Sequence, residues 1–122
     1  MHYQGLVLFS WYKEKALVEK PYRELMSIYR MGEAQAKPET IDALRDFLIS
    51  IMPGIRSSQG CESVALYQSQ DDPTKFTMIE IWDSVESHQA SVKNIPLEML
   101  AEIRPLLASA PSGSYYNFVS SL

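Results

Sequence analysis

Glu80, Trp82, His88 and Arg104 are of the types that can carry acid–base chemistry on an aromatic compound. His88 titrates near neutral pH and can remove a phenolic proton as a general base, and Arg104 can stabilise the resulting oxyanion. Trp82 offers an apolar wall on which a flat ring can stack. We therefore expect His88 and Arg104 to be catalytic. We expect the substrate to lie against one face of a strand, made of Phe76, Met78, Glu80 and Trp82.

Each of these side chains also has a purely structural interpretation. A tryptophan on a strand often belongs to the core, and a histidine on an apolar helix stripe is often a hydrogen-bonded core residue. Because a lone buried carboxylate is costly, Glu80 is expected to pair with Arg104 or His88. Arg104 can also lie along a helix end with its charged head in water. The residues alone leave both interpretations open.

A strand and a helix must position Glu80, Trp82 and His88. Residues 75–82 are nearly all strand formers, and side chains two apart on a strand share a face. Asp83, followed three residues later by Glu86, predicts a capping box that opens a helix. One face of that helix holds Val85, His88 and Val92. His88 is thereby expected to point inward, about one and a half helical turns beyond the strand.

A second helix is expected to carry Arg104. Asn94 can cap this helix, Pro96 stands in its first turn, and Pro105 kinks or ends it. One of its faces holds Leu97, Leu100 and Arg104, and another holds Met99, Ile103 and Leu106. In this arrangement Arg104 can converge with the strand residues and His88 on one pocket.

The remaining elements are short. Strands are predicted over residues 26–36, 61–70 and 114–119, and turn residues over 71–73 precede the strand over 75–82. Between the first two strands, apolar residues at spacings of three and four predict a helix, and Pro53-Gly54 should break or kink its end. The apolar stripe of this helix consists of Ile41, Leu44, Leu48, Ile51 and Ile55.

The order of these elements is βαββαβ, which predicts an α+β fold. The pattern is ferredoxin-like, with a four-stranded antiparallel sheet and helices on one face. The other face would expose the strand residues Thr77, Ile79 and Ile81. An exposed apolar patch usually marks an interface, and a homodimer that closes sheet against sheet covers it simply. We therefore expect a homodimer.

Residues 1–24 are expected to form an N-terminal arm outside the domain of residues 25–122. Within the arm, residues 5–12 are predicted to form a short strand and residues 13–20 two helical turns, which Pro21 interrupts. The arm is rich in large apolar side chains, namely Leu6, Leu8, Phe9, Trp11 and Tyr12. We therefore expect it to pack on the domain or on a partner subunit.

Length, charge and cysteine content exclude several classes of protein. The 122 residues suit one domain, and 11 basic against 15 acidic side chains give a net charge of −4. This acidic balance argues against nucleic-acid and anionic-membrane partners. A single cysteine, Cys61, cannot form an internal disulfide, and with two histidines it argues against a zinc site. The apolar run over residues 6–9 is too short to span a bilayer and no Lys or Arg precedes it, so we expect a cytoplasmic protein.

Several segments resemble the antibiotic biosynthesis monooxygenase (ABM) domain. The motifs are Gly-Cys at residues 60–61, Tyr-x-Ser at 67–69, and Glu-x-Trp-x-Ser at 80–84 opening a helix. Residues 32–38 resemble the first strand and turn of that family. The resemblance covers residues 27–120 and implies a dimeric α+β barrel. The family includes cofactor-free quinone-forming monooxygenases and haem-degrading enzymes.

The site residues match the family unevenly. In the quinone-forming type, a tyrosine stands where this chain has His88, and an asparagine where it has Met78. Arg104 matches an arginine of that type if two residues are inserted. The helix histidine of the haem-degrading type is replaced here by Ala101, which argues against haem degradation.

Two functions remain. The first, which the resemblance implies, is a cofactor-independent monooxygenase that oxidises a small phenol, hydroquinone or anthrone-like substrate with O2, using neither metal nor cofactor. The alternative is a non-catalytic dimeric barrel that binds a ligand or assists another protein. An open cleft that reaches Glu80, Trp82 and His88 favours the enzyme, and a sealed, packed space around His88 favours the binding protein.

Overall fold

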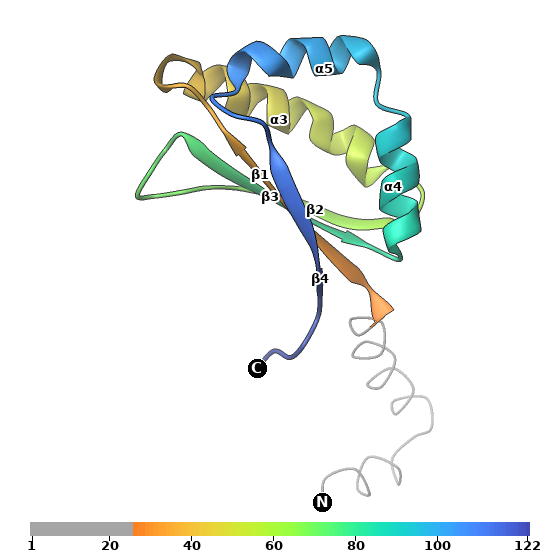
Figure 1. The fold of residues 1–122 in the computed structure, drawn as a ribbon. Coiled ribbons are helices and arrows are strands. Elements are labelled where there is room, and N and C mark those ends of the chain that lie inside the picture. The colour runs from red at the N-terminus through yellow and green to blue at the C-terminus, as the bar shows by residue number, and fades with distance from the viewer. Residues whose placement is uncertain (1–25) are drawn as a thin grey trace, which may run out of the picture.

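Residues 26–122, the part of the chain that the computed structural model describes, form a four-stranded antiparallel sheet with helices on one face (Figure 1). The N-terminal arm predicted over residues 1–24 lies outside the described residues. This element order confirms the predicted ferredoxin-like α+β fold. No helix of residues 26–122 has the length and apolar character needed to cross a membrane. In chain order the elements are β1 (Ile28–Gln35), a 3-10 turn (Pro38–Thr40), α3 (Ile41–Arg56), β2 (Cys61–Gln68), β3 (Lys75–Trp82), α4 (Val85–Lys93), α5 (Leu97–Ile103), a 3-10 turn (Arg104–Leu106) and β4 (Ser112–Asn117).

The register of the sheet fixes which side chains face the helices. The strand order is β2-β3-β1-β4, and Arg30 of β1 lies opposite Glu80 of β3. Because side chains alternate along a strand, every second residue of β3 faces the helices. The helix-facing residues of β3 are Phe76, Met78, Glu80 and Trp82, as the alternation predicts, and all but the half-buried Glu80 are buried.

Helix α3 extends beyond the end that the sequence predicts. Pro53 lies inside the helix, which continues to Arg56. A proline lacks only its own N–H donor, and the Pro53 carbonyl still accepts the backbone N–H of Ser57 at 3.0 Å. Of the two outcomes predicted for Pro53-Gly54, a break or a kink, the break does not occur, because the last turn keeps its other hydrogen bonds.

The caps of α4 and α5 also differ from the prediction. Ser84, not Asp83, precedes α4, and its hydroxyl accepts the backbone N–H of Ser87 at 3.1 Å. Serine and aspartate are equally good N-caps, so the extended backbone at Ser84 decides between them. Asn94 ends α4 instead of capping α5, which follows Pro96. Both helices thus begin later in the chain than the predicted cap residues indicate.

Three strands have bounds that differ from the predicted ones, and β1 covers Ile28–Gln35 instead of residues 26–36. Strand β2 ends at Gln68 instead of residue 70, because the hydroxyl of Ser69 already accepts the Asp72 N–H in the turn at 3.1 Å. Strand β4 covers Ser112–Asn117 instead of residues 114–119. Gly113, whose neighbours look like a loop in the sequence, pairs with Gly32 of β1. Pairing with β1 therefore draws this glycine into the sheet.

The core lies between α3 and the sheet. Its buried members are Ala36, Leu44, Leu48, Phe76 and Met78. Leu44 and Leu48, four residues apart on α3, place one helix face on the strand residues. This packing fixes α3 over the part of the sheet from which the functional side chains project.

Shortening Leu44 is expected to destabilise the domain strongly. Leu44 is fully buried, and Leu44→Ala should lower the free energy of unfolding by about 2–5 kcal/mol, because it removes methyl groups and leaves a cavity. Ile49 on the same helix is about half exposed, so Ile49→Ala should change it by less than about 0.5 kcal/mol. Urea denaturation of both variants measures the difference. Equal losses would show that α3 does not pack as the structure has it.

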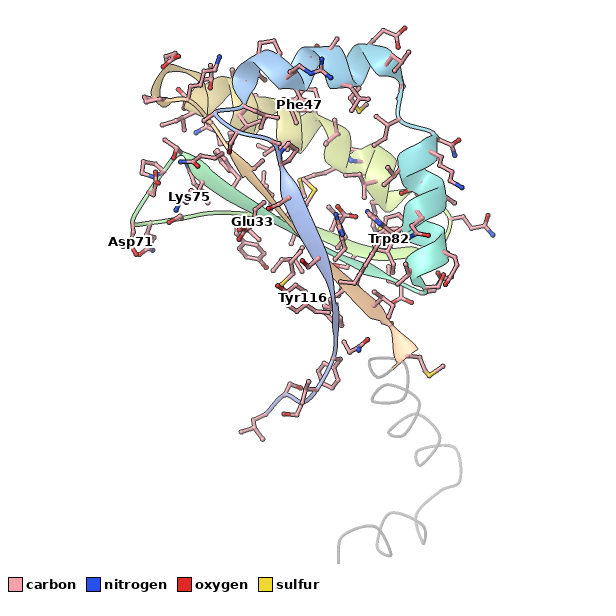
Figure 2. All side chains as sticks on the ribbon, viewed as in Figure 1. Glu33, Phe47, Asp71, Lys75, Trp82 and Tyr116 are labelled. Carbon is pink, nitrogen blue, oxygen red and sulfur yellow. The ribbon has the colours of Figure 1, made fainter. Side chains whose placement is uncertain are left out.

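The face of the sheet opposite the helices carries large apolar side chains that residues 26–122 leave partly exposed. Tyr67 and Tyr116 are the most exposed of its large side chains, at 56% and 49%, and Tyr116 lies on the side of β4 away from the helices (Figure 2). Ile79 and Ile81 lie between them on β3 and are only half-buried. The predicted open face is therefore present.

Candidate functional site

A cavity of about 500 Å³ lies between the helices and the sheet. Arg30, Glu80 and His88 line it, together with the exposed Glu33. Most of the other walls are apolar and include Leu48, Ile51, Leu66, Phe76, Met78 and Met99. Some lining residues are exposed, among them Asn94, Pro96 and Pro111, so the cavity reaches the surface. Such a space suits a mostly apolar ligand with a polar group at one end.

Arg30 and Glu80 project into the cavity from neighbouring strands. They lie opposite each other in the β1–β3 ladder. The next pair on the same face of the sheet is Gly32 and Met78, two residues further along each strand. Burial of a cation and a carboxylate is costly for each alone, and their opposite charges offset part of that cost. The strand register thereby places a basic and an acidic side chain on neighbouring strands at the cavity wall, and the Arg30 guanidinium itself lies over the Tyr115 ring of β4.

His88 lies on the inner side of α4 and is only 9% exposed. Its Nδ1 atom is 2.6 Å from the hydroxyl of Tyr115 on β4, and its Nε2 atom is 4.0 Å from Oε1 of Glu80. The helix that carries it begins at the Ser84 cap, directly after β3. The predicted inward position of His88 is therefore present, and its two ring nitrogens have different neighbours.

Trp82 does not line the cavity, but it contacts Glu80 and His88, which do. Its side chain is fully buried at the α4 end of the sheet (Figure 2). The indole Nε1–H donates to Oε1 of Glu80 at 2.8 Å, and the indole ring meets the imidazole of His88 edge-on, with 5.4 Å between ring centres. Trp82 thus orients Glu80 and His88, whereas the sequence predicts a stacking wall for the substrate.

Burial acts on both titratable groups of the cavity. Loss of water raises the pKa of Glu80 above its ordinary value, and the Trp82 hydrogen bond and the Arg30 charge counteract part of that rise. Burial lowers the pKa of His88 below its ordinary value, and the positive charge of Arg30 lowers it further. Both shifts favour the uncharged forms, so His88 is a neutral imidazole near neutral pH and can accept a proton.

The stability of the domain should depend on pH through His88. Its folded pKa lies below the ordinary value of 6.5, so between the two values the unfolded chain binds more protons. The free energy of unfolding should therefore fall as the pH drops below about 6.5, by no more than about 1.4 kcal/mol per pH unit for one proton. His88→Gln should remove this loss, which urea denaturation at several pH values measures.

Glu80 gives a control of the opposite sign. Its folded pKa lies above 4.5, so the folded protein holds the proton more firmly and stability falls as the pH rises above about 4.5. Glu80→Gln should remove the loss of stability above about pH 4.5 and keep the loss below about pH 6.5 that His88 causes. An unchanged pH dependence in His88→Gln would contradict the assigned burial of His88.

The structure does not bring Arg104 into this cavity. Arg104 begins the 3-10 turn after α5, is exposed, and lines a second cavity of about 450 Å³ with residues such as Leu100 and Leu107. Arg30 occupies the place that the sequence assigns to Arg104. Phe76 and Met78, by contrast, line the main cavity as expected. The predicted residues that meet around the site are thus Phe76, Met78, Glu80, Trp82 and His88.

Sequence reasoning missed Arg30 and Tyr115. Both belong to strands that meet only when β4 pairs with β1, where the two residues lie opposite one another. The guanidinium carbon of Arg30 lies 4.8 Å from the centre of the Tyr115 ring. Arg30 could have been found from the sequence, because it is a basic residue in the middle of a predicted strand, at a position that faces the helices.

The residues around the cavity do not form a metal site. Within residues 26–122, no three His, Cys, Asp or Glu side chains gather as metal ligands do. Glu80 and His88 form a pair whose other neighbours are Trp82 and Tyr115. The chemistry of this donor set is that of proton transfer.

Comparisons with known proteins agree on one family. The family model described as antibiotic biosynthesis monooxygenase matches residues 27–96. A solved structure from Chloroflexus aurantiacus J-10-fl, named for the same family, is 32% identical, with 79% of this chain and 96% of that chain covered and a TM-score of 0.63. No curated protein matches the chain.

Two further structures share the fold. A conserved protein from Methanosarcina mazei Go1 is 19% identical, with 80% of this chain and 97% of that chain covered and a TM-score of 0.72. A protein from Nitrosomonas europaea, also named for this family, is 18% identical, with 77% and 91% covered and a TM-score of 0.71. At these identities the similarity concerns the fold alone.

Proposed function

The chain belongs to the antibiotic biosynthesis monooxygenase family, and from this premise we propose that it is a monooxygenase that oxidises a small aromatic substrate with O2 and without a cofactor. The substrate is a phenol, hydroquinone or anthrone-like compound. The observation that carries the proposal is the gathering of Arg30, Glu80 and His88 at an otherwise apolar cavity. Apolar walls suit the ring system, and the three polar groups suit its oxygen atoms.

His88 is the general base of the proposed reaction. Its lowered pKa keeps the imidazole neutral, and Nε2 is the ring nitrogen that Tyr115 does not occupy. A substrate hydroxyl within reach of Nε2 also lies near Oε1 of Glu80, because only 4.0 Å separates the two atoms. The imidazolium that forms is then stabilised by the neighbouring carboxyl.

Arg30 stabilises the anion that proton removal creates. Its positively charged guanidinium lies against β4 beside the cavity. A fixed cation in a largely apolar space is worth more to a developing oxyanion than one in water. Arg30 therefore takes the role that the sequence assigns to Arg104.

The oxygen chemistry balances without another reactant. The electron-rich anion passes one electron to O2, and the two radicals join as a hydroperoxide on the ring carbon. Loss of water then leaves a carbonyl, so a phenol whose ring carbon carries hydrogen and O2 give a quinone and H2O. One oxygen atom enters the product and the other leaves as water, whose two hydrogens come from the substrate hydroxyl that His88 deprotonates and from the ring carbon.

A binding protein without chemistry is the second candidate. It is favoured by the hydrogen bonds among the site residues, since Trp82 satisfies one oxygen of Glu80 and Tyr115 satisfies one nitrogen of His88. Such a set is stable without a ligand. The cavity would then bind an aromatic compound and leave it unchanged.

Oxygen uptake separates the two candidates. Chelator-treated protein is mixed with a panel of anthrones and dihydroxynaphthalenes, and O2 consumption is compared with the protein-free rate. The oxygenase should accelerate uptake for at least one compound. Uptake at the protein-free rate, together with quenching of tryptophan fluorescence by the same compounds, would contradict the oxygenase and support the binding protein.

The open face of the sheet should form a homodimer. Ile79 and Ile81 lie on it between Tyr67 and Tyr116, and partly exposed apolar side chains gathered on one face favour an interface. Ile79→Lys should convert a dimer into a monomer in light scattering after gel filtration. Ile49→Lys, on the exposed side of α3, should leave the dimer intact. A wild type that is monomeric at all concentrations would contradict the expectation.

A further inference from the structure

Tyr115 contacts two of the three polar groups of the site, His88 and Arg30, without lining the cavity. It lies on β4, which runs beside β1 (Figure 1). Its hydroxyl is 2.6 Å from Nδ1 of His88, and its ring lies under the Arg30 guanidinium at 4.8 Å. The ring also meets the imidazole of His88 edge-on, with 5.4 Å between centres. One side chain therefore touches the proposed base and the proposed cation.

The backbone of β4 completes the slot that holds Arg30. Gly113 lies two residues before Tyr115 and faces the same side of the sheet. A Cβ at Gly113 would lie 2.7 Å from Cζ and 2.9 Å from Nε of Arg30, closer than side chains pack. The guanidinium therefore lies across the bare backbone of Gly113 and beside the Tyr115 ring. Gly113 and Tyr115 together therefore fix the position of the Arg30 guanidinium.

The hydrogen bond between the Tyr115 hydroxyl and Nδ1 also affects which ring nitrogen of His88 carries the proton. If Nδ1–H donates to the phenol oxygen, the lone pair of Nε2 is free on the side of Glu80. The same bond persists, and becomes charge-assisted, when Nε2 takes up a proton. In the opposite tautomer the phenol O–H donates to Nδ1 and Nε2 carries hydrogen, so His88 is no base toward the cavity.

We propose that Tyr115 is a positioning residue that holds His88 in the Nδ1–H tautomer and the Arg30 guanidinium beside it. This inference rests on the proposed oxygenase function. Tyr115 does not touch the substrate and acts through the two groups that do. The groups that face His88 are Glu80 from β3, Arg30 from β1 and Tyr115 from β4, besides the uncharged Trp82.

Nitrogen NMR of the imidazole tests the tautomer without any substrate. In the ¹⁵N-labelled protein, correlations from the carbon-bound ring protons to the ring nitrogens identify which nitrogen carries hydrogen, and His88→Gln distinguishes His88 from His2. The wild type should show a protonated Nδ1 and a free Nε2. Tyr115→Phe should show a mixture of both tautomers. A wild type with hydrogen on Nε2, or a Tyr115→Phe variant with an unchanged pattern, would overturn the proposal.

Kinetics test the consequence for the proposed reaction. Tyr115→Phe keeps the ring under Arg30 but loses the hydroxyl, so kcat should fall about tenfold with KM unchanged. The acidic limb of the kcat profile should move to lower pH, because the imidazolium loses an acceptor for Nδ1–H. A shift to higher pH would show that the hydroxyl donates to Nδ1, and would overturn the assignment.

Two more variants complete the design. Tyr115→Leu removes ring and hydroxyl, so it should raise KM as well as lower kcat. Tyr116→Phe, the same change on the opposite face of β4, should leave both values and the pH profile unchanged. If the wild type has no oxygenase activity, the proposed function fails while the NMR result still decides whether Tyr115 sets the tautomer.

Discussion

A His88→Gln variant is expected to lose about 10²- to 10⁴-fold of the kcat of the proposed oxygenase, the range that a positioned general base contributes. Glutamine can still hydrogen-bond the Tyr115 hydroxyl, but it cannot accept a proton from the substrate. The domain should remain folded, because the replacement fills a similar volume beside Trp82. Initial rates of O2 uptake at saturating substrate measure the loss.

The control for His88→Gln is a substitution at the neighbouring residue of α4, Gln89. Gln89 is exposed on the outer side of α4, so Gln89→Ala should keep the wild-type rate. Circular dichroism of both variants checks the fold. Wild-type kcat in a folded His88→Gln variant would remove His88 from the mechanism and would leave Glu80 as the base to examine.

Replacing Arg30 should have the second large effect. Arg30→Met keeps much of the aliphatic stem but removes the charge, and kcat should fall by about 10²- to 10³-fold, as for the loss of one oxyanion donor. Arg30→Lys restores the charge without the planar group that lies on the Tyr115 ring, so it should recover only part of the rate. Oxygen uptake at saturating substrate measures both.

Arg104→Met is the matched control for Arg30→Met. The two arginines compete for one role, and only Arg30 lines the main cavity. Arg104→Met should therefore keep the wild-type kcat. A large loss in Arg104→Met, with none in Arg30→Met, would contradict the position of the site and restore the assignment made from the sequence.

Local patterns predicted the element that carries most of the site. Strand β3 has the predicted bounds because its residues alternate and nearly all favour strands. Alternation also placed Glu80 with Phe76 and Met78 on the helix side. The inward position of His88 followed from the spacing of its helix. These features depend on residues close together in the chain, so the sequence alone suffices for them.

The cation and the tyrosine depend on contacts that local patterns do not contain. Arg30 and Tyr115 are neighbours only because β4 returns to pair with β1 across most of the domain. Arg104 looked suitable because it shares a helix face with Leu100. The structure instead ends α5 at Ile103 and turns the chain, so that Arg104 faces a different cavity.

The role of Trp82 depended on packing depth. Alternation correctly put the side chain on the helix side of β3, but it does not distinguish a cavity wall from a residue behind that wall. Helix α4 covers the end of β3 and places His88 against the indole, which leaves no surface of Trp82 at the cavity. Which helix-facing side chains line the cavity, and which are covered by a helix, becomes known only when the helices are in place.

The most direct test of the proposed oxygenase follows the oxygen atoms themselves. Chelator-treated protein is given the most reactive anthrone of the panel under ¹⁸O2, and the product is analysed by mass spectrometry beside the His88→Gln variant. The proposed reaction predicts one ¹⁸O atom in each product molecule, formed at the accelerated rate by the wild type only. Product formed at the accelerated rate without ¹⁸O, or labelled product formed equally fast by His88→Gln, would contradict it.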